Sequence, residues 1–174
     1  MTGPNEGGID WDNPIGGQPV QDVSAIPGVV GFSIVVPPKS LGDLVGVYAT
    51  PATDGGLGAV DFVYDLDRGR VVVGEGLWDF PPDHWREWVD SVVATSDAAA
   101  LRTPSPSEGS EIVFGSAQTY ALANGRLGLL TTSEDGKQSD IQWPEPSGVQ
   151  VVVQGPNLSV DHATEIAQEI AASL

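Results

Sequence analysis

The stretch VDFVYDLDRGRVVV, residues 60–73, decides the fold class. From residue 60 to residue 66, large apolar side chains alternate with smaller or charged ones, which is the period of a strand that buries one face. Asp67-Arg68-Gly69 then supplies a tight turn into a second apolar run, residues 71–78. The stretch therefore predicts a β-hairpin, which is the elementary unit of an antiparallel sheet.

Further β-like runs, divided by turn residues, lie on both sides of this hairpin. The strongest turn is Asn124-Gly125, because both residues tolerate the positive φ of a type I′ turn. Asp135-Gly136 and Pro146-Ser147-Gly148 separate the runs that follow. The last four strands should form an antiparallel meander. The additional strands are expected over residues 29–36, 44–50, 119–123, 126–132, 139–143 and 149–154.

Two segments change to the helical period. Over residues 81–98 the apolar side chains recur at i, i+3, i+4, i+7 and i+8, beginning at Trp85, and prolines stand at the first turn. Residues 159–174 carry a second apolar stripe, and Ser159 stands where an N-cap hydroxyl belongs. The sequence thus predicts an α+β fold. We expect a strongly curved antiparallel sheet, a half-barrel of about eight or nine strands, with both helices packed on its concave face.

Residues 1–28 differ in composition from the rest of the chain. They are rich in Gly and Pro and contain four acidic residues but no basic one. This composition predicts a flexible acidic tail ahead of a single domain over residues 29–174. The sequence shows neither the pattern of a signal peptide nor an apolar run long enough to span a membrane. Trp11 is an aromatic residue in this polar tail and a candidate for docking onto a partner.

The charge balance narrows the classes of partner. The chain has 7 Lys and Arg against 24 Asp and Glu, a formal net charge of −17. Nucleic acids and anionic lipid surfaces reward clustered basic side chains, so both are disfavoured as partners, and direct membrane insertion is not expected. The sequence has no cysteine, which excludes disulfides and thiolate metal sites.

No catalytic pattern stands out. His84 and His162 lie on different predicted helices, and a pairing of His162 with Asp161 competes with a simple solvated first turn. The run Asp65-Leu66-Asp67-Arg68-Gly69 resembles the start of a calcium loop, but Arg70 stands where the loop requires glycine. We therefore expect no metal, no cofactor and no catalytic residues, and an enzyme is the least favoured class.

The last third of the chain carries a family resemblance. It reads as a strand that ends in Trp143, a turn at Gly148, an alternating strand to Gly155, a Leu158-Ser159 cap and a closing helix. Over roughly residues 111–174 this pattern resembles an uncharacterised bacterial domain family of extracytoplasmic sigma-factor regulators and lipoproteins, similar to outer-membrane lipoprotein carrier (LolA-like) proteins. The resemblance implies a half-barrel sheet with helices in its mouth, an extracytoplasmic location and no catalytic residues.

Three tryptophans form the candidate ligand site. Trp78, Trp85 and Trp88 either fill the core beneath the first helix or line an apolar cavity for a small hydrophobic ligand. The favoured function is accordingly a non-enzymatic binding or sensor module that holds a hydrophobic ligand or contacts a protein partner. The alternative is a structural or assembly protein that docks through its N-terminal tail. The sequence leaves open the identity of the ligand and partner, the compartment and the oligomeric state.

Overall fold

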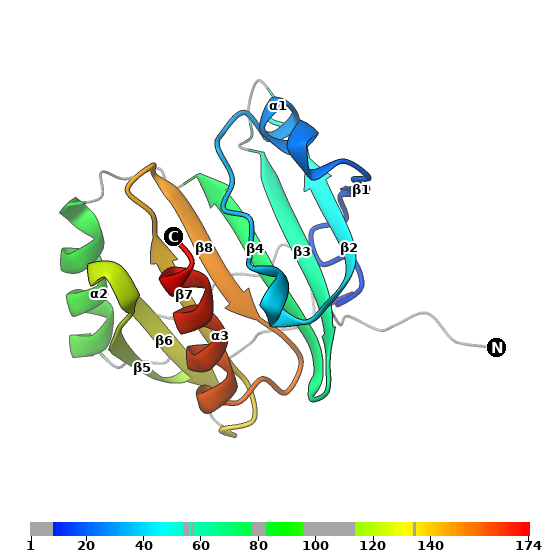
Figure 1. Cartoon of the computed structure of the whole chain (residues 1–174). Coiled ribbons are helices and arrows are strands. Elements are labelled where there is room, and N and C mark those ends of the chain that lie inside the picture. The colour runs from blue at the N-terminus through cyan, green and yellow to red at the C-terminus, as the bar shows by residue number, and fades with distance from the viewer. Residues whose placement is uncertain (1–8, 54–55, 57, 78–82, 96–113, 134) are drawn as a thin grey trace.

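Eight strands form one antiparallel sheet in the computed structural model, which describes residues 9–53, 56, 58–77, 83–95, 114–133 and 135–174 (Figure 1). The strand order is β1-β2-β3-β4-β8-β7-β6-β5. Two meanders, β1 to β4 and β5 to β8, therefore meet where β4 pairs with β8. The strands are β1 (Gln18–Pro19), β2 (Asp43–Thr50), β3 (Ala59–Leu66), β4 (Gly69–Leu77), β5 (Phe114–Ala121), β6 (Leu127–Ser133), β7 (Ser139–Pro144) and β8 (Val149–Gln154).

Both predicted hairpin turns are confirmed. Leu66 pairs with Gly69 across the β3–β4 turn. Gly69 adopts a φ of 117°, a backbone conformation that would be strained in a residue with a side chain. At the β5–β6 turn, Asn124 and Gly125 have φ values of 58° and 74°. These two residues lie in a short 3₁₀ turn, η3 (Ala123–Gly125), which closes when the N–H of Arg126 donates to the carbonyl of Ala123 at 3.4 Å.

The two predicted helices are also present. The first is α2 (Asp83–Thr95), and the second is α3 (Val160–Ala172). Ser159 caps α3 as expected, because its hydroxyl accepts a hydrogen bond from the N–H of His162 at 3.3 Å. The remaining described turns are η1 (Val23–Ala25), α1 (Ile26–Val30) and η2 (Lys39–Leu41).

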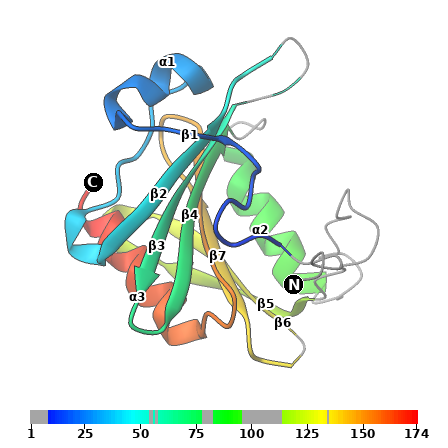
Figure 2. The same ribbon diagram turned by 90° about the vertical axis from the view of Figure 1, so that its right-hand side faces the viewer.

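The helices pack on opposite faces of the sheet, so the prediction that both lie on one face is wrong. Successive strand side chains alternate between faces, and the neighbours Leu129 and Leu130 of β6 are both buried. Leu129 packs with Trp85 and Val89 of α2, whereas Leu130 belongs to the larger core that contains Ile170 of α3. Figure 2 shows the sheet between α2 and α3. The sheet is neither closed nor strongly curled, and the half-barrel stays an expectation.

The main core lies between α3, α1 and the facing side of the sheet. Strands β3, β4, β7 and β8 supply alternate side chains to it, in the period that the sequence predicts. The largest fully buried side chain is Trp143 of β7. The members of the main core include Ile26, Val30, Val60, Phe62, Tyr64, Val71, Val73, Leu130, Ile141, Trp143, Val149, Val151, Val153, Ile166 and Ile170.

The strand predicted over residues 29–36 is wrong. This run ends the short helix α1 and continues as an extended connection without strand pairing. Pro27 stands at the first turn of α1, where its missing N–H costs nothing, and Gly31 ends the helix in the left-handed conformation with a φ of 83°. These two residues outweigh the β-branched side chains between them. Gly58 packs so closely here that a Cβ would lie 2.4 Å from the carbonyl oxygen of Val30.

Structured residues begin well before the predicted boundary at residue 28. Gln18 and Pro19 pair with Ala49 and Tyr48 of β2, and Ile26 is fully buried. Upstream of this strand, Asp12 forms an ion pair with Arg70 of β4 at 2.8 Å. Part of the predicted tail therefore lies against the sheet, while the flexibility expected of it stays a prediction.

The burial of the two α2 tryptophans yields a stability prediction. Trp85 is 3% exposed, and its Nε1–H donates to the carbonyl of Leu127 at 2.8 Å, whereas Trp88 is 37% exposed. We expect Trp85→Ala to reduce the free energy of unfolding by about 3–5 kcal/mol, because it empties the space between α2 and β6. Trp88→Ala should cost less. Urea titrations followed by circular dichroism measure both, and a larger loss for Trp88→Ala would contradict the placement of the helix.

Candidate functional site

The structure describes two of the three predicted site tryptophans. Trp78 lies outside the described residues. The rings of Trp85 and Trp88 lie together on α2, with centroids 5.2 Å apart and an interplanar angle of 35°. Trp85 fills the interface between α2 and the sheet. Trp11 is partly buried in the N-terminal segment. Ligand binding at the three tryptophans and partner docking at Trp11 stay predictions.

A groove of about 370 Å³ lies elsewhere, beside the N-terminal half of α3. Four segments meet there, of which the last two are consecutive in the sequence: η2 with the start of β2, the β3–β4 turn, the β8–α3 loop and α3 itself. We call this feature the α3 groove. Its lining residues are Leu41, Gly42, Asp43, Asp65, Leu66, Asp67, Arg68, Arg70, Val71, Pro156, Asn157, Leu158, His162, Glu165, Ile166 and Glu169.

Aliphatic side chains from all four segments supply the apolar part of the groove. Leu66 and Val71 flank the β3–β4 turn, and Ile166 lies on the buried stripe of α3. Gly42 has a φ of 141°, and a Cβ at this position would lie 2.5 Å from a methyl carbon of Leu66. Glycine is favoured where the chain enters β2, because its positive φ would be strained for a residue with a side chain.

The β8–α3 loop is fixed by its backbone. Gly155 lies against β4, since a Cβ there would approach the carbonyl oxygen of Arg70 to 2.5 Å. Asn157 adopts a positive φ of 58°, which asparagine tolerates better than most residues. The N–H of Ser139 donates to the carbonyl of Leu158 at 2.7 Å and ties the loop to β7. The groove therefore has one wall that is rigidly attached to the sheet.

Charged side chains supply the rim of the groove. Five acidic and two basic residues contribute to the lining, so its formal charge is 2 − 5 = −3 with His162 neutral. Arg70 also forms the ion pair with Asp12 at its Nη2 atom. The hydroxyl of Ser40 donates to Oε1 of Glu169, which links η2 to α3. The carboxylates are those of Asp43, Asp65, Asp67, Glu165 and Glu169, and the cations are Arg68 and Arg70.

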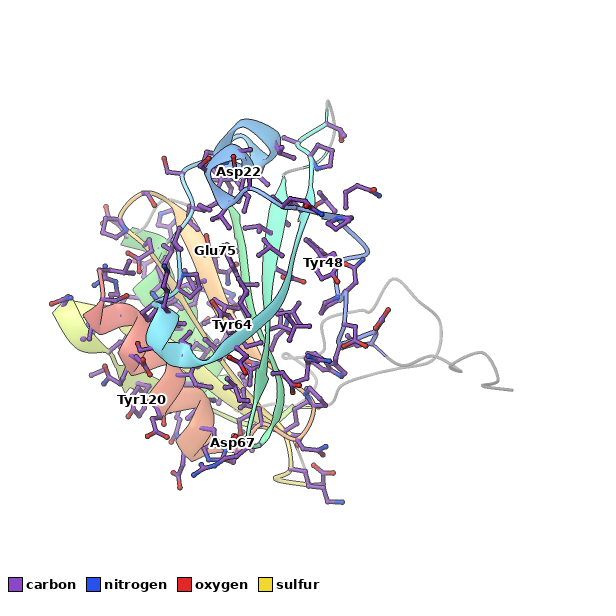
Figure 3. The ribbon with its side chains drawn as sticks, turned by 45° about the vertical axis from the view of Figure 1, so that its right-hand side comes forward. Asp22, Tyr48, Tyr64, Asp67, Glu75 and Tyr120 are labelled. Atoms are coloured by element: carbon purple, nitrogen blue, oxygen red, sulfur yellow. The ribbon has the colours of Figure 1, made fainter. Side chains whose placement is uncertain are left out.

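A second polar feature lies in the main core, at Glu75 of β4 (Figure 3). Glu75 is 4% exposed, and its Oε2 accepts a hydrogen bond from the N–H of Val35 at 2.8 Å. Its Oε1 is buried and has no hydrogen-bond partner among the described residues. Burial, reinforced by the nearby charge of Glu145, raises the pKa of Glu75 to about 8. The same environment raises the pKa of Tyr64 to about 12, through its own burial and the proximity of Glu75.

Glu145 has the partners that Glu75 lacks. Arg126 binds it with two hydrogen bonds, from Nε to Oε1 at 2.7 Å and from Nη2 to Oε2 at 2.8 Å. The indole Nε1–H of Trp143 donates to Oε1 at 2.8 Å. This bidentate pair compensates the buried charge of Glu145.

A third buried acid, Asp61, lies on the opposite face of the β3–β4 hairpin. It is 2% exposed, and its Oδ2 finds no hydrogen-bond partner in the part of the chain that the structure describes. Burial raises the pKa of Asp61 to about 7, and the backbone amide of Ile15 partly offsets this rise by stabilising the charged form. The N-terminal segment that contains Ile15 therefore covers the carboxyl group of Asp61, whose neutral form is favoured by burial.

The two histidines remain apart. His84 is exposed on α2, and His162 lines the α3 groove on the opposite face of the sheet. Within the described ranges, no three His, Asp or Glu side chains gather closely enough to hold a metal ion. None of the helices in the described part of the chain is long and apolar enough to cross a membrane.

Comparisons with protein-family models, with curated proteins and with solved structures find no match to this chain. The site must therefore be interpreted from its own geometry. Sequence reasoning missed the α3 groove because its walls come from four separate segments and no local pattern joins them. The sequence did indicate that Glu75 faces the core. It follows Val73 by two residues and Val71 by four, and both of these valines face the core.

The burial of Asp61 predicts a pH dependence of stability. Its pKa is raised from 3.8 to about 7, so the stability that its neutral form provides is complete below pH 4 and is lost as the pH rises through 7. At about 1.36 kcal/mol per pKa unit, the loss is up to about 4 kcal/mol. Asp61→Asn cannot ionise, so its free energy of unfolding should fall less between pH 4 and pH 8 than that of the wild type. Urea titrations across this range test the difference, and equal slopes would refute it.

Proposed function

We propose that the protein is a non-enzymatic binding module whose ligand lies in the α3 groove. The observation that carries this proposal is a groove lined by both aliphatic and charged residues. Its volume of about 370 Å³ lies within the usual range of small-molecule sites, about 300–1,000 Å³. Binding of an apolar group would be driven by the removal of apolar surface from water.

The rim charge favours a ligand with an apolar body and a cationic group. The formal charge of −3 at the rim attracts cations, and the net charge of −17 on the whole chain acts in the same direction over longer distances. Exposed carboxylates such as Asp67 and Glu165 are free to approach an ammonium group without a large desolvation cost. An aliphatic amine is thus the simplest probe of the site.

The family resemblance supports the same class of function. Sensor and carrier domains of the extracytoplasmic kind bind a ligand or a partner without chemistry, and we include an extracytoplasmic location and a half-barrel curvature of the sheet in the proposal. The assembly alternative draws on the N-terminal segment. Because Gln18 and Pro19 pair with the chain's own β2 and Asp12 binds Arg70, that segment has an intramolecular docking site. This contact favours the binding module over the assembly protein.

Octylamine and octanoate test the proposal as a matched pair, because they have the same chain length and opposite charge. We expect octylamine below its aggregation concentration to shift the backbone NMR signals of Leu41, Leu158 and Ile166 saturably, and octanoate to bind more weakly. Added salt should weaken the binding of octylamine, because salt screens the attraction between its ammonium group and the carboxylates.

Variants locate the effect. Asp67→Asn and Glu165→Gln should each weaken octylamine binding about two- to fivefold, the range of an exposed ion pair. Glu87→Gln, at an exposed acid of α2 outside the groove, is the control and should leave the affinity unchanged. NMR signal shifts confined to Trp85 and Trp88 would show that octylamine binds at the tryptophans and not in the α3 groove. No saturable shift, together with self-association that strengthens in salt, would favour the assembly protein.

A further inference from the structure

One wall of the α3 groove belongs to a connection outside the strands and the long helices, whose Phe32 and Val35 side chains are buried in the main core. Residues 31–42 run from α1 to β2 across the face of the sheet that α3 also covers, and we call this segment the strap (Figure 1). Its lower end supplies Leu41 and Gly42 to the groove. Apart from the single turn η2, the strap has neither helical nor strand hydrogen bonds, so side-chain contacts must hold it in place.

Two glutamates hold the strap at points five residues apart in the chain. Glu75 of β4 accepts the N–H of Val35 at 2.8 Å, and Glu169 of α3 accepts the hydroxyl of Ser40. The first bond is buried and the second is exposed. Water competes with the exposed bond, so the buried bond at Glu75 contributes more to holding the strap. The apolar side chain of Val35 packs into the core beside it.

Within the described residues, no cation acts on Glu75 to stabilise its charge. The ionisable groups that act on it are Tyr64 from β3 and Glu145 beyond β7, and Arg126 is already bound to Glu145. The α1 helix and strap residues 31–38 contain no ionisable side chain, and the buried residues of α3 include none either. Its cross-strand neighbours are Val60 and Val151. One N–H is therefore the main compensation that a negative charge on Glu75 finds here.

We propose that Glu75 is a proton-controlled latch for the strap, and that protonation thereby regulates the α3 groove. The proposal rests on the proposed function of that groove. When Glu75 is protonated, its neutral carboxyl group accepts the hydrogen bond from the N–H of Val35 and buries no charge in the core. With the proton released to solvent, the carboxylate lies beside Glu145 with one buried oxygen unpaired. Lifting the strap admits water to the carboxylate and removes this cost.

The direction of the pH effect follows from the burial of Glu75. Burial raises its pKa to about 8 in the closed state, whereas an open strap returns it towards its ordinary value of 4.5. Opening therefore releases a proton between these two values. The opening equilibrium should rise with pH by up to about tenfold per pH unit and should level off above pH 8.

Amide hydrogen exchange of the full chain, corrected for intrinsic rates, measures this opening directly. We expect the protection of Val35 and Leu41 to fall with pH up to about pH 8 and to stay well below that of Val153 in β8, whose exchange follows global unfolding and therefore also the ionisation of Asp61. Glu75→Gln keeps an acceptor for the N–H of Val35 but cannot ionise, so its profile should be flat. Glu87→Gln is the matched control and should follow the wild type.

A second measurement does not depend on any variant. The side-chain carboxyl ¹³C signal of Glu75 in the wild type should titrate near pH 8, together with the amide shifts of the strap. Constant protection of Val35 in the wild type, or an equal slope in Glu75→Gln, would overturn the latch.

Octylamine affinity separates the latch from the function of the groove. We expect the affinity to fall between pH 6 and pH 9 in the wild type and to stay constant in Glu75→Gln. Saturable binding without any response of the strap would overturn the latch and leave the binding module. A responsive strap without saturable binding would remove the proposed function and leave the latch. A responsive strap with unchanged affinity would overturn the regulation of the groove.

Discussion

The pairing of β4 with β8 is the constraint on which the rest of the structure depends. It joins residues about eighty positions apart, from Val72 with Gln154 to Leu77 with Val149, and it merges two local meanders into one sheet. Because β4 begins where β8 ends, the β3–β4 turn lies beside the β8–α3 loop. Gly155 allows the two backbones to approach closely. The α3 groove exists only because this pairing brings both turns to the same end of the sheet.

The sequence predicted the local elements well because their signals are local. The turns at Gly69 and Asn124, the strand periods and the cap at Ser159 each depend on a few neighbouring residues. The failure over residues 29–36 has the same origin. A run of β-branched residues favours a strand, but Pro27 and Gly31 define a short helix around it, and the close contact of Gly58 with Val30 holds that helix against the sheet.

The non-local relations could not be read in the same way. Two amphipathic helices can cover one face of a sheet or both faces, and their apolar stripes are alike in either case. Strand β6 distinguishes the two arrangements, because Leu129 and Leu130 are both apolar and each faces a different helix. A strand that is apolar on both faces is typical of a sheet covered on both sides. That signal was present in the sequence, and it outweighs the expectation of a single concave face.

The buried acids are features that the sequence analysis did not single out. Tryptophans attract attention as ligand residues, yet Trp85 packs as an ordinary core residue and satisfies its N–H internally. Glu75 occupies a core position by its strand period, although its side chain is charged in water. Alternation alone therefore marks it as a residue that must be neutral, paired or exposed by a local opening.

Glu75 and Glu145 face the same core and illustrate the two ways of burying a carboxyl group. Glu145 accepts hydrogen bonds from Arg126 and from the indole N–H of Trp143. Glu75 has one N–H of the strap, and an apolar side chain of similar length would fill its space without a desolvation cost. Packing alone therefore does not explain a carboxyl group at this position. What it adds is a bond between the sheet and the strap whose strength depends on one proton, at the segment that forms a wall of the groove.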